Sequence, residues 1–92
     1  MPLMIVQQKV KDYRAWKKIF NAAYAIRKAS GERSCKIFRN TEDPNEITLL
    51  LEWDDIQNAM KYSQSKLFKE AEKKAGAITE PILYLPEDGL DT

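Results

Sequence analysis

The sequence contains no histidine, and this absence excludes several kinds of catalytic site. Ser-His-Asp and Cys-His nucleophile pairs, histidine-ligated zinc or non-haem iron, and histidine-ligated haem all require that side chain. The single cysteine, Cys35, cannot form an internal disulfide or hold a zinc or iron–sulfur site, and it is typical of a reducing compartment. None of the three glycines belongs to a phosphate-binding loop. We therefore expect a protein that uses no metal and no cofactor.

Long apolar runs are also missing. No stretch approaches the roughly 20 residues that span a bilayer, and the first residues have the wrong pattern for a signal peptide. The 92 residues, 43% hydrophobic and 32% charged, are typical of one globular domain. We expect a cytoplasmic protein with no membrane partner, made of a single domain over residues 1–86 and an acidic tail over residues 87–92.

Charge is close to balanced overall but unevenly distributed. The net charge is +1, yet residues 9–39 carry ten basic and two acidic side chains, whereas residues 42–55 carry six acids and no base. The basic half is compatible with an anionic ligand or with RNA. Solvated helix faces and edge strands explain the same pattern, and the near-neutral total favours them. We expect no nucleic-acid partner.

Two strand-to-helix units follow one another along the chain. Residues 3–9 are apolar on both alternating faces, which predicts a strand covered on both sides. Asp12 is placed to cap a helix whose apolar stripe includes Tyr13, Trp16 and Phe20, and Gly31 is placed to end it. Residues 34–40 and 46–53 predict the second and third strands.

The second unit has the same plan. Asp54 or Asp55 is expected to cap a helix that turns Ile56, Ala59 and Met60 inward. Ser65 then caps a shorter piece over residues 66–75, closed by Gly76. Residues 81–86 are bracketed by prolines, which predicts a fourth strand at an edge of the sheet.

The apolar content of the strands predicts their order. The first and third strands are apolar on both faces and therefore central, whereas the second, with its lysine and arginine, is an edge. These features predict an α+β fold, a ferredoxin-like βαββαβ sandwich with a four-stranded antiparallel sheet in the order 4-1-3-2. Both helical units would cover the same face of that sheet.

The other face of this sheet would place leucine and isoleucine in water. A contiguous exposed apolar patch usually marks an interface. A second copy packed sheet against sheet covers it most simply, so we predict a homodimer in which each sheet forms half of an α+β barrel.

Aromatic residues are the best candidates for a binding site, since small-molecule pockets are typically apolar and aromatic with a few polar anchors. Core packing explains many of the nine aromatics equally well, because Trp and Phe fill protein interiors. Polar candidates near a strand end are Arg39 and Asn40. The candidate ligand-binding residues are Tyr13, Trp16, Phe20, Tyr24, Phe38, Arg39, Asn40, Trp53, Met60 and Tyr62.

Three polar features have competing interpretations. Asp54 and Asp55 form either a paired carboxylate site or helix caps, and capping is favoured. Cys35 is either a thiolate activated by neighbouring basic residues or a buried filler, and the filler is favoured. Arg39 and Asn40 either hold an anionic substrate or lie on a solvated edge, which is the simpler explanation.

Several stretches together resemble the dimeric α+β barrel superfamily, in particular its antibiotic-biosynthesis monooxygenase-like branch. The matching stretches are residues 10–13 with Trp16 and Phe20, then 27–31, 38–40, 43–46, 52–55, 65–67 and 75–76. The resemblance implies a ferredoxin-like homodimer with a cleft between sheet and helices. Haem-degrading members use a histidine ligand, and its absence here argues against haem degradation. Close relatives often carry a histidine near residues 21–24, and its absence argues against an inherited acid–base role at that position.

The resemblance leaves two functions open. One is cofactor-free oxidation of a small aromatic compound, in which a deprotonated, electron-rich phenol itself reduces oxygen. The other is a non-catalytic homodimer that binds a small hydrophobic ligand in the same cleft. No residue maps onto a known catalytic residue, so the resemblance leaves the catalytic residues unassigned.

Overall fold

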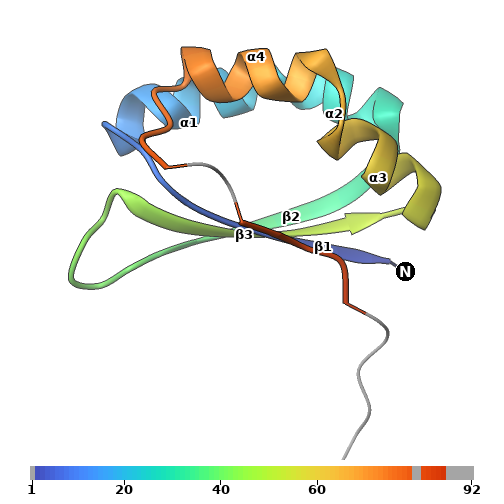
Figure 1. Ribbon diagram of the computed structural model, residues 1–92, viewed down its shortest axis with the longest axis horizontal. Helices are drawn as coiled ribbons and strands as arrows, with labels where there is room; N and C mark the ends of the chain where they lie inside the picture. Colours follow the sequence, from blue (N-terminus) through green and yellow to red (C-terminus); the bar gives the residue numbers. More distant parts are fainter. Residues whose placement is uncertain (1, 80–81, 87–92) are drawn as a thin grey trace, which may run out of the picture.

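A computed structural model describes residues 2–79 and 82–86, so the expected acidic tail lies outside the described residues. The elements along the chain are β1 (Leu3–Lys9), α1 (Tyr13–Ala22), α2 (Tyr24–Ser30), β2 (Glu32–Arg39), β3 (Glu46–Trp53), α3 (Ile56–Ser63), α4 (Lys66–Lys74) and β4 (Ile82–Tyr84). They form two layers, with all the helices on one face of the sheet (Figure 1). No described helix has the length and apolar content needed to cross a bilayer.

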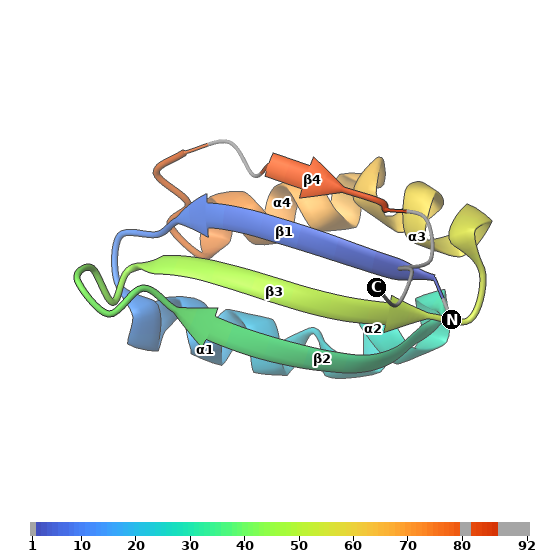
Figure 2. The same cartoon turned by 90° about the horizontal axis from the view of Figure 1, so that it is seen from below.

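The sheet has the predicted topology. Its order is β2-β3-β1-β4, and every neighbouring pair is antiparallel (Figure 2). The doubly apolar strands β1 and β3 are central, where they pair from Leu3 opposite Glu52 to Lys9 opposite Glu46. This confirms the α+β ferredoxin-like prediction.

The predicted helix ends are also confirmed. The Asp12 carboxylate accepts the backbone N–H of Ala15 at 3.3 Å, and Asp55, rather than Asp54, accepts that of Gln57 at 2.7 Å. Ser65 caps α4 by accepting the N–H of Phe68 at 3.1 Å. Gly31 ends α2 at φ 118°, a conformation in which a side chain at this position would be strained.

The structure divides the first predicted helix in two. The helix breaks at Ala23, whose backbone leaves the helical region and separates α1 from α2. A break leaves carbonyl groups of the preceding turn without their helical donors. The guanidinium of Arg27 contacts the carbonyl oxygen of Phe20 there and so replaces a donor that a continuous helix would have supplied.

One predicted helix face is partly wrong. Ile56 and Met60 were expected to point inward, but they are 37% and 41% exposed. Ala59 and Tyr62 are the buried residues of α3. The strand boundaries also differ slightly, since β2 begins at Glu32 and ends at Arg39. The observed β4 is limited to Ile82–Tyr84, and Pro81 lies outside the described residues.

The core lies between the two layers. Met4 and Val6 of β1 and Leu49 and Leu51 of β3 alternate inward and are almost fully buried. The helices contribute Trp16, Ala59, Tyr62 and Phe68 to the same cluster. The residues in between point to the other, helix-free face.

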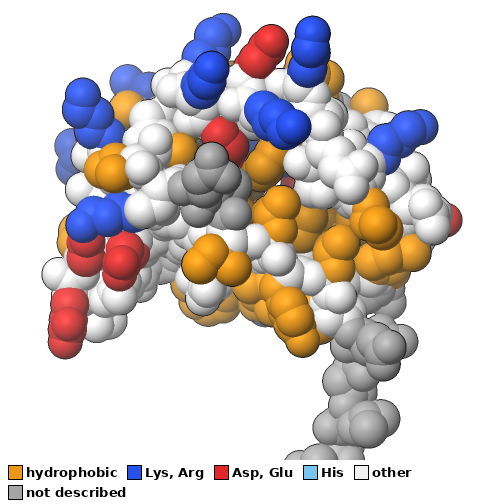
Figure 3. Space-filling view, in the orientation of Figure 1, with side chains coloured by type: hydrophobic (Ala, Val, Ile, Leu, Met, Phe, Trp, Pro, Cys, Tyr) orange, Lys and Arg blue, Asp and Glu red, His pale blue; other side chains and the backbone are white. Residues whose placement is uncertain are grey.

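The helix-free face is crossed by two rows of paired residues. One row runs Lys36, Leu50, Ile5, Tyr84, and the other runs Phe38, Thr48, Gln7, Ile82. Phe38, Ile82 and Tyr84 are each more than half exposed, and Ile5 and Leu50 are half-buried. Hydrophobic side chains gather below the helix layer in Figure 3, whereas basic side chains gather over the helices. The predicted apolar patch is therefore present.

Candidate functional site

A narrow inner cavity lies between the sheet and the helices. Its volume is about 40 Å³, enough for only a few water-sized molecules. Four aromatic rings contribute to its wall, and the indole of Trp16 stacks on Phe20 with ring centroids 4.8 Å apart. The lining residues are Val6, Trp16, Ile19, Phe20, Ala23, Arg27, Leu49, Leu51, Tyr62, Phe68, Ala71, Glu72 and Ala75. The cavity is thus predominantly apolar.

A wider outer groove lies at the side of the cleft where α4 faces β4. Its volume is about 540 Å³, within the range of pockets that hold drug-sized molecules. It is lined by Ser63, Phe68, Lys69, Glu72, Lys73, Ala77, Ile78, Thr79 and Leu83. Phe68 and Glu72 line both the groove and the inner cavity, so they stand between the two spaces.

Glu72 is a titratable group at this junction. It is half-buried, and its Oε1 accepts a hydrogen bond from Nε2 of Gln8 at 3.2 Å. Burial raises the pKa of the Glu72 carboxyl to about 7, against the opposing effect of the Gln8 hydrogen bond. Within the described residues, neither Oε2 of Glu72 nor Oε1 of Gln8 has a hydrogen-bond partner.

Arg27 supplies the positive charge in the cavity wall. Only 4% exposed, it pairs with the buried Glu32 through a 2.9 Å contact between Nε and Oε1. Its guanidinium also lies 3.6 Å from the centroid of the Phe20 ring. Burial raises the pKa of Glu32, and the charge of Arg27 opposes that rise. This cation is thus occupied by contacts within the protein.

The structure brings four of the predicted site residues together. Trp16, Phe20 and Tyr62 line the inner cavity. Trp53 is fully buried behind them, with its ring centroid 5.3 Å from that of Tyr62. Trp53 therefore belongs to the core beneath the cavity. Its indole N–H has no partner among the described residues.

The other predicted residues lie elsewhere. Tyr13 and Arg39 stack on each other, with the guanidinium 3.7 Å from the ring centroid, and neither lines the cavity. Tyr24 is 57% exposed and Met60 is 41% exposed. Phe38 lies on the helix-free face of the sheet. These positions share aromatic or polar character with the cavity residues but not their location.

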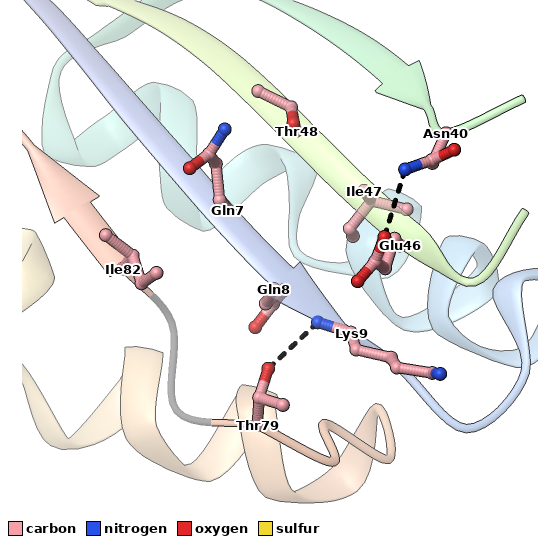
Figure 4. Close-up of a pocket in the computed structure, with 9 residues that line it drawn as sticks. All are labelled: Gln7, Gln8, Lys9, Asn40, Glu46, Ile47, Thr48, Thr79 and Ile82. Atoms are coloured by element: carbon pink, nitrogen blue, oxygen red, sulfur yellow. Dashed lines mark hydrogen bonds between the residues drawn. The ribbon is translucent and has the colours of Figure 1, made fainter. Parts of the chain in front are cut away.

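Asn40 lines a separate polar pocket at the ends of the central strands. The pocket has a volume of about 390 Å³ and is lined by Gln7, Gln8, Lys9, Asn40, Glu46, Ile47, Thr48, Thr79 and Ile82. Figure 4 shows the Asn40 amide donating to the Glu46 carboxylate at 3.0 Å, and the Lys9 backbone N–H donating to Thr79 Oγ1. Two hydrogen bonds thus join residues of the lining, while Gln8 and Lys9 also bond to Glu72 and Asp43 outside it.

Two of the competing polar interpretations, those of the aspartate pair and of Cys35, can be compared with the surroundings of these residues. Asp54 accepts hydrogen bonds from Asn58 and Arg33, and Asp55 caps α3, so the two aspartates hold local structure. Cys35 is half-buried, and burial raises the pKa of its thiol to about 11, which is unfavourable for a reactive thiolate. Among the described residues, no three carboxylate or thiol groups gather where a metal ion could bind.

Three polar residues of the cleft were not predicted: Gln8, Arg27 and Glu72. For Arg27 and Glu72 a signal existed in the helical spacing, whereas Gln8 lies on strand β1, on the buried side with Val6 and Val10. Arg27 lies four residues after Ala23 and seven after Phe20 on the inward stripe, and Glu72 lies four residues after Phe68 on the inward stripe of α4. Polar residues inside an apolar stripe are expensive to bury, and they mark candidate sites for that reason.

Solved structures share this fold. A Bordetella bronchiseptica protein provisionally named an antibiotic biosynthesis monooxygenase is 21% identical, with 97% of both chains covered and a TM-score of 0.78. A similarly named Caulobacter crescentus protein is 15% identical, with 97% of this chain and 90% of that one covered, and a TM-score of 0.75. SnoaB, a cofactor-independent oxygenase from Streptomyces nogalater, is 14% identical, with 99% and 97% covered and a TM-score of 0.71.

At these identities the structural likeness establishes the fold alone. A search of curated proteins finds no match. A family model described as antibiotic biosynthesis monooxygenase matches residues 11–74, which include α1, α2, β2, β3, α3 and α4, the helix that carries Phe68 and Glu72. The match covers most of the chain and agrees with the sheet order and the cleft, so the chain belongs to the antibiotic biosynthesis monooxygenase family within the dimeric α+β barrel superfamily.

Proposed function

We propose that this protein oxidises a small hydroxylated aromatic compound with molecular oxygen and without a cofactor. The observation that carries the proposal is the cleft, in which an aromatic wall adjoins a carboxyl group with a pKa of about 7. The family of the chain supports the same chemistry. We also propose that the protein acts in the cytoplasm, because a single cysteine is compatible with a reducing compartment.

The chemistry requires little of the protein beyond binding and proton transfer. Deprotonation of an electron-rich phenol allows the ring to transfer an electron to O₂, and the two radicals then combine through a carbon–oxygen bond. Loss of water converts a ring methylene into a carbonyl, so one oxygen atom enters the product and the other leaves as water. The substrate supplies every electron, and no external reductant is needed.

The two spaces of the cleft suggest where the substrate lies. The inner cavity, at about 40 Å³, is too small for an aromatic ring, whereas the outer groove at about 540 Å³ accommodates one. We therefore place the substrate in the groove between α4 and β4, with its reactive edge toward Phe68 and Glu72. Lys69 and Lys73 along the groove would favour a substrate that gains negative charge.

Oxygen consumption tests this proposal. In a panel of phenols, naphthols and anthrones, we expect at least one compound to be consumed with uptake of one O₂, and ¹⁸O₂ should label the product with a single oxygen. Phe68→Leu removes an aromatic wall shared by both spaces, and we expect kcat/KM to fall about tenfold or more. Tyr24→Ala, at an exposed position outside the cleft, is the control. Absence of turnover across the panel would contradict the proposal.

A second function, non-catalytic binding of a small hydrophobic ligand, is favoured by one observation. Arg27, the cation in the cavity wall, is already paired with Glu32. Its charge is therefore not free to stabilise a negative charge on a substrate, as a cation in an active site usually does. This alternative expects a hydrophobic compound to raise the melting temperature with no product formed. Thermal shift and product analysis on the same compound panel separate the two functions.

We also propose that the protein is a homodimer that packs through the helix-free face of the sheet. The rows through Leu50 and Thr48 carry the apolar side chains Ile5, Phe38, Ile82 and Tyr84, which water would otherwise contact. A second copy would cover both rows and complete an α+β barrel. The interface would use the face opposite the cleft and leave the groove accessible.

Sedimentation equilibrium tests the dimer. We expect a mass of two chains at micromolar concentration for the wild type. Leu50→Glu introduces a charge at the centre of the proposed interface, and it should shift the protein to a single-chain mass with the circular dichroism spectrum retained. Lys61→Glu, on the exposed surface of α3, serves as the control. A wild-type protein that remains a single chain at micromolar concentration would refute the dimer.

A further inference from the structure

We propose that Glu72 and Gln8 form the polar end of the cleft, where they bind the hydroxyl group of an aromatic ligand and Glu72 accepts its proton. This inference rests on the proposed function and assigns residues to its first step. It makes Glu72 a catalytic residue and Gln8 a binding residue that also holds Glu72 in position.

The first support is an unmet need for hydrogen-bond donors. Gln8 is 5% exposed and uses its Nε2–H to hold Oε1 of Glu72 at 3.2 Å. Two acceptors remain, Oε1 of Gln8 and Oε2 of Glu72, and both are buried without a partner among the described residues. An unsatisfied buried polar atom costs about 1–3 kcal/mol, so a ligand hydroxyl that donates to one of these two acceptors would gain binding energy there.

The second support is location. Glu72 is the only carboxylate among the described residues that line the inner cavity or the outer groove. Phe68, one helical turn earlier on α4, lines the same two spaces and offers a ring face beside the carboxylate. A flat aromatic compound in the groove would therefore contact apolar surface with its ring and an acceptor with its hydroxyl. This arrangement of apolar walls and one polar anchor is typical of small-molecule sites.

The surrounding charges are compatible with a carboxyl that changes state near neutral pH. On α2, Arg27 is neutralised by its partner Glu32, and on α3 the Tyr62 hydroxyl is buried, which raises its pKa. Lys69 and Lys73 lie on the groove side of α4 and are solvent-exposed. Burial outweighs these effects and places the Glu72 pKa at about 7.

The proton-transfer step is simple to balance. The ionised Glu72 Oε2 takes the proton of the ligand hydroxyl, the O–H bond of the ligand breaks, and its electron pair stays on the ligand oxygen. A new O–H bond forms on Glu72. The Nε2–H of Gln8 donates to Oε1 of Glu72 throughout and so holds the carboxyl in place. A base with a pKa near the working pH is well matched to this task.

A matched pair of probes tests the inference without turnover. Isothermal titration calorimetry would measure the binding of 2-naphthol and of 2-methoxynaphthalene, which lacks only the hydroxyl donor, between pH 5.5 and 8.5 under anaerobic conditions. At pH 8 we expect the wild type to bind 2-naphthol about tenfold more tightly than the ether. This preference should decrease through pH 7 as Glu72 takes up a proton.

Three variants separate the roles. Glu72→Leu should abolish the preference, and Glu72→Gln should leave a smaller preference that no longer depends on pH. Gln8→Leu removes the one hydrogen bond that lowers the Glu72 pKa, so the pH midpoint of the preference should rise. Glu70→Gln, on the exposed side of the same helix, should behave as the wild type.

The outcomes distinguish this inference from the proposed function. Equal affinity of the wild type for the two probes, or a pH-dependent preference retained in Glu72→Gln, would overturn the inference. If the panel compounds are oxidised while Glu72→Gln leaves kcat/KM and its pH profile unchanged, the oxidation stands and Glu72 is not its base. If the preference is present but no compound consumes oxygen, the binding site stands and the oxidation fails.

Discussion

Replacing Arg27 by leucine is expected to lower the free energy of unfolding by about 3–5 kcal/mol, the cost of breaking a buried ion pair on one side. The Glu32 carboxylate is 1% exposed and would lose its partner at 2.9 Å. The Phe20 carbonyl at the helix break would lose a donor as well. Urea denaturation at pH 7.5 and fixed protein concentration would measure the change.

The control and the pH dependence make this expectation specific. Arg14→Leu, on the exposed side of α1, should change stability by less than about 1 kcal/mol. Adding Glu32→Leu to Arg27→Leu should recover part of the loss, because no charge then remains buried without a partner. The loss should also shrink at acid pH, where Glu32 becomes neutral. An Arg27→Leu protein as stable as Arg14→Leu would contradict the role assigned to the pair.

Replacing Glu72 by glutamine is expected to stabilise the protein at pH 8 by roughly 2–3 kcal/mol. Burial raises the Glu72 pKa from 4.5 to about 7 in the folded chain. Between these two values the folded protein holds a proton that the unfolded chain has released, so the stability that this residue contributes falls as pH rises. A neutral glutamine keeps the Gln8 contact and loses this dependence.

Urea denaturation of the wild type and Glu72→Gln from pH 4 to pH 8 measures this effect. The two proteins should be similar near pH 4 and should diverge between about pH 4.5 and pH 7, with the wild type the less stable. Glu32 also has a raised pKa, but its contribution is common to both proteins and cancels. Parallel stability curves would show that the Glu72 pKa is not raised. If Glu72→Gln is more stable than the wild type and no longer shows the pH-dependent preference for 2-naphthol over its methyl ether, then Glu72 lowers stability in return for ligand binding.

The sequence predicted the fold well because its signals are local and repeated. The capping residues Asp12 and Ser65 and the terminating Gly31 act within one helical turn, so the structure confirms them directly. The strand order followed from which strands are apolar on both faces, because central strands covered on both sides carry apolar residues at successive positions. These features do not depend on contacts between distant parts of the chain.

Errors arose where a longer-range contact decided the outcome. The helix break at Ala23 accompanies a contact between Arg27 and the Phe20 carbonyl, and the helical spacing alone gives no sign of it. Met60 belongs to the apolar spacing of its helix, but Tyr62 takes the inward position because it packs against Trp53 and Phe68. The choice between these residues depends on the shape of the space above the sheet.

The candidate site shows the same division. Trp16, Phe20 and Tyr62 were predicted as aromatic lining and do meet at the cavity, whereas Tyr13, Tyr24 and Phe38 are also aromatic and lie elsewhere. Gln8 and Glu72 were not predicted. They are 64 residues apart in the sequence, and only the packing of α4 over β1 brings their side chains within 3.2 Å.

By itself, the sequence determined most of the secondary structure, the sheet order, the family and the absence of histidine chemistry, because each follows from residue type and spacing along the chain. The tertiary structure alone decided which polar groups are removed from water and which of them meet. Burial sets the pKa of Glu72 and pairs Arg27 with Glu32, and burial is a property of the assembled layers that no single segment contains.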